Sequence, residues 1–129
     1  MSDREQAIEL VSVAERDLRA LKGMLDRATF ATEVFGFTAQ QAVEKALKAW
    51  LCRLGVEYPY IHDIGDLLTL LEDNGQAVGG LWDFDDLTTF AGHARYGVRA
   101  ADRDPFDRRD VITRVESLVA RIRSLTVDV

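Results

Sequence analysis

Apolar residues recur at every third or fourth position through three long segments of this chain, and no other feature constrains its fold as strongly. One face of an α-helix repeats every 3.6 residues, so this spacing marks helices that bury a single stripe. A β-strand would need apolar and polar residues to alternate, and no stretch between turn signals sustains that alternation. The sequence therefore predicts an all-α fold.

Two long helices are expected in the first half of the chain. The first begins after a cap at Ser2 or Asp3. Its apolar stripe consists of Ala7, Leu10, Val11, Ala14, Leu18, Leu21 and Leu25. The second is expected to run from about residue 29 to about residue 54, with Gly55 ending it. The glycine within residues 35–37 is expected to loosen this helix, because glycine costs about 1 kcal/mol against alanine there.

Two further helices are expected in the middle of the chain. The shorter one begins after Asp63, whose side chain can cap it, and stops at Asn74-Gly75. The next is expected to run from about Asp83 or Asp85 to Val98, with its apolar residues again at helical spacing.

Pro105 then breaks the chain, so residues 101–105 are predicted to form a loop before a last helix over about residues 107 to 125. A chain of 129 residues is long enough to bury one core, and it is expected to form one domain over residues 1–129. The predicted architecture is an up-and-down antiparallel helical bundle of about five helices, with a four-helix core and the short third helix capping it.

The charge balance limits the kinds of partner. The net charge is −6 and the isoelectric point is near 4.9. A protein that wraps nucleic acid carries a basic footprint, so direct nucleic-acid binding is not expected.

The compartment follows from three features of the sequence. Cys52 is the only cysteine and is expected to be a small core residue, which fits a reducing environment. The first residues, MSDREQAIEL, lack the apolar stretch of a signal peptide. No apolar run approaches the ~18 residues of a membrane-spanning helix. The protein is expected in the cytoplasm, away from membranes.

A polar row runs along the second helix. Gln41, Glu44, Lys45 and Lys48 are spaced by three and four residues, so they share one face. Glu44 precedes Lys48 by four residues, and an ordinary ion pair on a solvated face would explain part of the row. Gln40 and Gln41 bring no such pairing, which leaves open a binding surface or an active site.

The His62-Asp63 dipeptide raises the possibility of a metal site. Metal-dependent phosphohydrolases use such dipeptides, but they need further ligands, and no histidine precedes His62. No metal site is expected, because Asp63 as a helix cap, with Asp66 in the first turn, explains the pair. The acidic stretch at residues 82–86 is likewise interpreted as a solvated helix start rather than a divalent-ion site.

The fourth predicted helix carries a second group of chemically capable side chains. His93 and Tyr96 share one face of it, while Arg95 and Arg99 share another. Arginine forks and a phenol suit the binding of phosphate or a carboxylate. The alternative is that these arginines pair with the acids of residues 102–104 or of a neighbouring helix.

Residues 37–72, FTAQQAVEKALKAWLCRLGVEYPYIHDIGDLLTLLE, resemble the central helix and following loop of HEPN domains (higher eukaryotes and prokaryotes nucleotide-binding). The residues that match the family's run are Gln40, Gln41, Ala42, Glu44, Lys45, Ala46, Leu47, Lys48, Ala49, His62, Asp63, Leu67 and Leu68. A second match is Ala94-Arg95-Tyr96, which is similar to the family's RYP motif with Gly97 in place of proline. With the helix count, the resemblance covers essentially the whole chain.

The resemblance implies a helical bundle that often forms homodimers and pairs with a small nucleotidyltransferase; such pairs include toxin–antitoxin modules. The expected function is a non-catalytic module that binds a nucleotide or substrate beside that partner, with no cofactor of its own. The expected ligand-binding residues are Gln41, Lys45, Lys48, His62, Arg95 and Tyr96. A structural role competes for this row, because the glutamine, glutamate and histidine would also suit buried hydrogen bonds to the 55–63 loop.

One branch of the family consists of metal-independent ribonucleases in which an arginine is followed by histidine after four to six residues. This chain departs from that spacing. Arg53 is the nearest arginine before His62, with eight residues between them, and none precedes His93 within that distance. The alternative is a divergent ribonuclease that uses His62 or His93 with Arg95 or Arg99. An interaction adaptor without a ligand is a third option.

Overall fold

The fold is seen in a computed structural model that describes residues 3–58, 61–88 and 106–127. Its elements are α1 (Asp3–Lys22), α2 (Thr32–Arg53), α3 (Ile64–Asp73), the 3₁₀ helix η1 (Gly79–Leu87) and α5 (Arg108–Thr126). The described residues contain no strand, which confirms the predicted all-α helical bundle. Within these residues, no helix is long and apolar enough to cross a bilayer.

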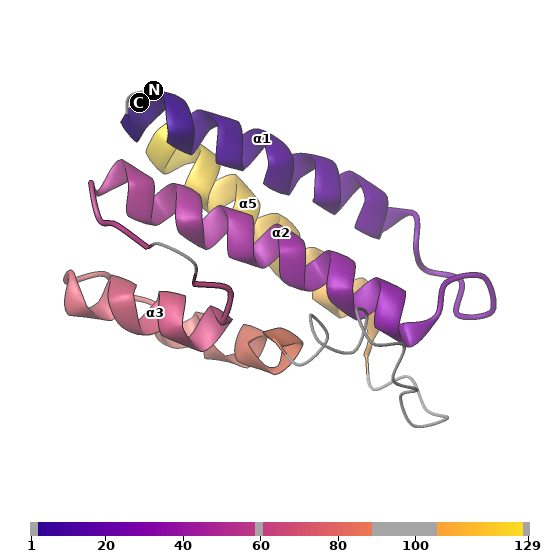
Figure 1. Cartoon of the computed structure of the whole chain (residues 1–129). Helices are drawn as coiled ribbons and strands as arrows, with labels where there is room; N and C mark the ends of the chain where they lie inside the picture. Colours follow the sequence, from indigo (N-terminus) through magenta and orange to yellow (C-terminus); the bar gives the residue numbers. More distant parts are fainter. Residues whose placement is uncertain (1–2, 59–60, 89–105, 128–129) are drawn as a thin grey trace.

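Three long helices form the main core. Figure 1 shows α1 and α2 as an antiparallel pair, with α5 lying against both of them. The C-terminal ends of α2 and α5 meet, since the Arg53 guanidinium donates a hydrogen bond to the Leu125 carbonyl (3.3 Å). The start of α5 is anchored at the other end of the bundle by Arg108. This buried guanidinium donates to the carbonyls of Met24 (2.7 Å) and Phe30 (2.8 Å).

Helix α2 is the central element of the fold. Fourteen of its 22 residues are buried, because α1, α5, α3 and η1 all pack on it. Figure 1 shows α3 and η1 as a second layer on the side of α2 away from α1. A helix that is covered on so many sides has little solvated surface left, so polar groups along it must find partners inside the protein.

The first three amide groups of α3 are each capped by a side chain. Asp63 accepts from the amide of Asp66 (3.1 Å), as the sequence predicts. Asp85 accepts from the amide of Gly65 (2.9 Å), and the Thr88 hydroxyl accepts from the amide of Ile64 (3.0 Å). These contacts join η1 to α3 and occupy three of the four donors that a helix start offers.

Several predicted boundaries differ from the structure. Helix α1 ends at Lys22, so the predicted continuation of its stripe to Leu25 is wrong; that side chain is 36% exposed. Asp26 instead accepts hydrogen bonds from the Ala28 amide and the Thr29 hydroxyl, and this local turn separates α1 from α2.

Two predictions about helix interiors are also corrected. Helix α2 begins at Thr32 and continues through Gly36 without a break, because burial beside Phe35 outweighs the low helix propensity of glycine. The helix predicted to start at Asp83 or Asp85 is a 3₁₀ helix through Leu87, opened by a hydrogen bond from the Leu81 amide to the Val78 carbonyl (2.8 Å). The remainder of that helix and the loop at 101–105 lie outside the described residues.

Candidate functional site

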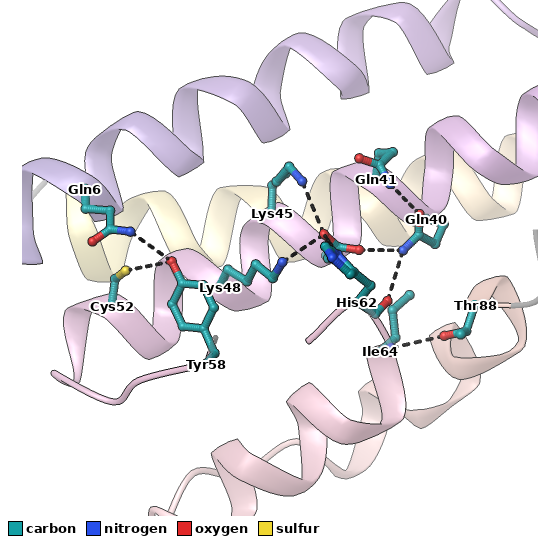
Figure 2. A network of polar contacts seen from close by, with 11 residues as sticks. Gln6, Gln40, Gln41, Lys45, Lys48, Cys52, Tyr58, His62, Ile64 and Thr88 are labelled. Atoms are coloured by element: carbon teal, nitrogen blue, oxygen red, sulfur yellow. Dashed lines mark hydrogen bonds and ion pairs between the residues drawn. The ribbon is translucent and has the colours of Figure 1, made fainter. Parts of the chain in front are cut away.

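The predicted polar row converges on one buried carboxylate, that of Glu44, which is 1% exposed. Its Oε1 accepts a hydrogen bond from the Gln40 amide nitrogen (2.8 Å). Its Oε2 contacts the ammonium groups of Lys48 (3.0 Å) and Lys45 (3.2 Å) and Nδ1 of His62 (3.3 Å). Figure 2 shows these groups gathered between α2 and the segment that leads into α3.

The spacing of α2 and a short loop together create this arrangement. Gln40, Glu44 and Lys48 are four residues apart, so they stack on the face of α2 that meets the second layer. Gln40 also donates to the main-chain carbonyl of His62 (3.3 Å). The network therefore ties the middle of α2 to the segment just before α3, as the structural interpretation of the row requires. The interpretation of the row as an ordinary solvated helix face is wrong for Glu44 and Lys48, because both residues are buried.

Opposing effects set the charge of Glu44. Burial raises the pKa of its carboxyl, but the nearby ammonium groups of Lys48 and Lys45 and the Gln40 amide together hold the pKa below its ordinary value. An ionised carboxylate only accepts hydrogen bonds, so the His62 nitrogen that faces it, Nδ1, carries a proton. The imidazole side chain is 67% exposed, which leaves Nε2 for contact with another molecule.

The other predicted residues differ in how far they reach solvent. Gln41 is half-buried and donates to the Gln40 amide oxygen (2.7 Å). Lys45 keeps a side-chain exposure of 25%, whereas that of Lys48 is 9%. The Lys48 ammonium also lies 5.6 Å from the centre of the Tyr58 ring, a cation–π contact. Arg95 and Tyr96, like His93 and Arg99, lie outside the described residues.

A second carboxylate balances part of the positive charge. Burial raises the pKa of Asp17 on α1, while Arg16 and Lys45 act in the opposite direction. Lys45 therefore pairs with Glu44 and also interacts electrostatically with Asp17. The exposed edge of the site consists of one ammonium group, one amide and one imidazole, which can together accept a polar, negatively charged ligand.

The start of α3 does not add to this ligand-binding capacity. A free helix start binds anions, but here carboxylates and a hydroxyl already cap its first amides. The predicted role of Asp63 as a cap is confirmed. Among the described residues, no group of three His, Cys, Asp or Glu side chains is placed to hold a metal ion.

Sequence reasoning missed a second polar cluster next to the first. The Tyr58 hydroxyl accepts from the Gln6 amide nitrogen (3.2 Å) and lies 3.1 Å from the Cys52 sulfur, as Figure 2 shows. Cys52 is buried, as predicted. No spacing in the sequence relates a residue near the start of α1 to the loop after α2, so pattern alone gave no signal for this cluster.

The comparison with family models decides the classification. The model of the HEPN domain matches residues 7–125, nearly the whole chain. The chain belongs to the HEPN domain family. No curated protein and no solved structure matches it. The matched residues include the Glu44 network on α2 and nearly all of α5.

Proposed function

We propose that this HEPN domain is a non-catalytic module that binds a nucleotide, or the substrate of a separate small nucleotidyltransferase, within a pair of the toxin–antitoxin type. The observation that carries the proposal is the convergence of Lys45, Lys48 and His62 on one oxygen of Glu44. A buried anion that orients two ammonium groups and an imidazole prearranges donors for phosphate, so little side-chain order is lost on binding.

Each side chain has a distinct role in this proposal. Lys45 meets the phosphate, since its ammonium group is the more exposed of the two. Lys48 contributes its positive charge to the phosphate from inside the protein, because its side chain is enclosed between Glu44 and the Tyr58 ring. Gln41 orients a base or sugar, and the exposed His62 ring shapes the rim. Arg95 and Tyr96 would complete the site in the same proposal, with a phosphate contact and a base contact.

Titration calorimetry with ATP tests the binding part of the proposal. We expect Lys45→Gln to weaken binding by about tenfold, the loss of one charge-assisted contact. Lys22→Gln is the matched control, because Lys22 forms an ion pair with Glu116 on the exposed surface of α1 and α5. If Gln41→Ala and His62→Ala lower thermal stability yet leave ATP affinity unchanged, the network is purely structural and the binding proposal fails.

The partner is tested separately. Native mass spectrometry of the protein purified gently from its host should show a complex with a second, small chain, and a retained nucleotide would name the ligand. The same spectrum reports whether the protein is the homodimer that we propose. A bare protein with neither partner nor nucleotide would contradict the pairing.

One observation favours a second candidate, a divergent metal-independent ribonuclease. His62 is held by a buried carboxylate through Nδ1 while its ring is exposed, and this is how a general base is oriented. The test is cleavage of RNA in the presence of EDTA. Cleavage that His62→Ala abolishes and Glu44→Gln reduces would establish this function; an inactive wild type would exclude it. The His93→Ala variant tests whether cleavage depends on the other histidine instead.

A further inference from the structure

A cavity of about 440 Å³ lies where α1 begins and α2 ends, apart from the exposed edge of the Glu44 network. Its lining residues are Asp3, Gln6, Cys52, Gly55, Val56, Glu57 and Tyr58. The volume lies within the range of roughly 300–1,000 Å³ that is typical of small-molecule sites. The proposed function above makes no use of this cavity.

Three of the lining side chains are polar but uncharged. The Tyr58 hydroxyl is hydrogen-bonded to the Gln6 amide nitrogen and lies next to the Cys52 sulfur (Figure 2). Burial raises the pKa of the Tyr58 phenol, and burial likewise raises the pKa of the Cys52 thiol, so both groups stay protonated at neutral pH. Gln6 donates through its nitrogen, which keeps its carbonyl oxygen as an acceptor.

The charge of the cavity comes from two carboxylates. Neither Asp3 nor Glu57 forms an ion pair with any residue that the structure describes. The negative charge of Asp3 adds to the effect of burial in raising the pKa of Cys52. The dipoles of α1 and α2 oppose each other here, because one helix begins where the other ends, so the carboxylates decide the sign.

The size and the lining of this negatively charged cavity indicate which kind of cation it can bind. A divalent metal ion needs several converging ligands, and the described residues offer no group of three. A cavity of this size, with an apolar wall at Val56 and the Tyr58 ring, instead suits a cation that carries its own alkyl chain.

We propose that this cavity binds a small organic cation of the alkylamine or polyamine class. Its ammonium groups donate to the carboxylates of Asp3 and Glu57 and to the Gln6 carbonyl, and its methylene groups lie along Val56 and the ring of Tyr58. The site is also linked to the Glu44 network. Lys48 contacts Glu44 and the Tyr58 ring together, so a ligand against Tyr58 adjoins a side chain of the network.

Titration calorimetry with spermidine at low ionic strength is the first test. The variant Asp3→Asn/Glu57→Gln removes both carboxylates of the cavity, and Glu9→Gln/Asp73→Asn removes two carboxylates elsewhere, so both variants change the net charge equally. We expect affinity to fall at least tenfold in the first variant and to stay within twofold of wild type in the second. Equal losses would mean that spermidine is only a counterion of an acidic protein, and no wild-type binding would also overturn the proposal.

Amide resonances locate the ligand. Spermidine bound in the cavity should shift the backbone amide signals of Gly55, Val56 and Glu57 in ¹H–¹⁵N NMR spectra, because these residues line it. Shifts confined to other parts of the chain during measurable binding would place spermidine elsewhere and refute the assignment. Circular dichroism checks that the Asp3→Asn/Glu57→Gln variant is folded; if it is not, Glu57→Gln alone replaces it.

Discussion

Replacing Glu44 with glutamine tests whether the polar row holds the protein together. The substitution keeps the size of the side chain but leaves the Lys48 ammonium, whose side chain is 9% exposed, without its counter-charge. Removing one partner of a buried ion pair costs about 3–5 kcal/mol. Lys45 and His62 are more exposed and add little, and Lys48 keeps its contact with the Tyr58 ring. We therefore expect a loss of about 3 kcal/mol, the lower end of that range.

A double-mutant cycle separates the charge from the packing. Lys48→Met alone leaves the carboxylate with Lys45 and His62 and should cost about 1–2 kcal/mol. Glu44→Gln/Lys48→Met closes the cycle: it removes both buried charges, keeps an acceptor for the Gln40 amide, and should cost no more than about 1 kcal/mol. The assay is urea unfolding followed by far-ultraviolet circular dichroism. A cost below about 1 kcal/mol for Glu44→Gln, or additive effects in the cycle, would refute the reasoning.

The Glu44→Gln variant also tests how the stability of the protein depends on pH. The folded protein holds the pKa of Glu44 below the ordinary value of 4.5, so its ionisation stabilises the fold above that value. This contribution is lost as the pH falls below 4.5 and through the lower pKa of the folded state. The stability difference between wild type and Glu44→Gln should therefore shrink in acid. A difference that stays constant from pH 7 to pH 3 would show that Glu44 does not act through its charge.

Two further predictions concern the rest of the scaffold. A Cβ at Gly65 would lie 2.8 Å from Oδ1 of Asp85, so Gly65→Ala should cost about 1–2 kcal/mol in urea unfolding by displacing that cap. Gly65→Ala should cost clearly less in an Asp85→Ala background. Gly80→Ala is the control: a Cβ there meets no atom within 4 Å, so the substitution should change stability by no more than about 0.5 kcal/mol. Arg108→Met leaves two carbonyls unpaired and should lower stability by about 3 kcal/mol; the exposed Arg109→Met is its control, and equal effects of the two would contradict the anchoring role.

The sequence predicted the parts of this protein that depend on local patterns. The three long helices follow from apolar spacing, since a buried stripe leaves a trace at every turn. The cap at Asp63 and the helix end at Gly55, which has a φ of 74°, follow from rules that act within a few residues. The ion pair of Glu44 with Lys48 is confirmed for the same reason.

What the sequence did not predict depends on contacts between distant residues. Nothing local marks Glu44 and Lys48 as buried, because their pattern is also that of a solvated helix face; burial results from the second layer that folds over them. Asp85 was interpreted as part of a solvated helix start, yet its carboxylate caps a helix 20 residues earlier. Arg108 likewise looked like one of many charged residues, and its buried role comes from distant contacts with the loop between α1 and α2 and with the Phe35 ring.

The position of α5 has a consequence for how the chain is made. The α1–α2 hairpin is complete once Arg53 has been synthesised, but the side chains that cover it from α5 emerge only after the intervening residues have followed. At 5–20 residues per second, the apolar groove of the hairpin stays uncovered for roughly 4–15 s. During that interval the nascent chain presents the surface that will later hold Val115, Leu118 and Ile122. A chaperone that engages this protein during translation should therefore bind the hairpin and leave when α5 docks.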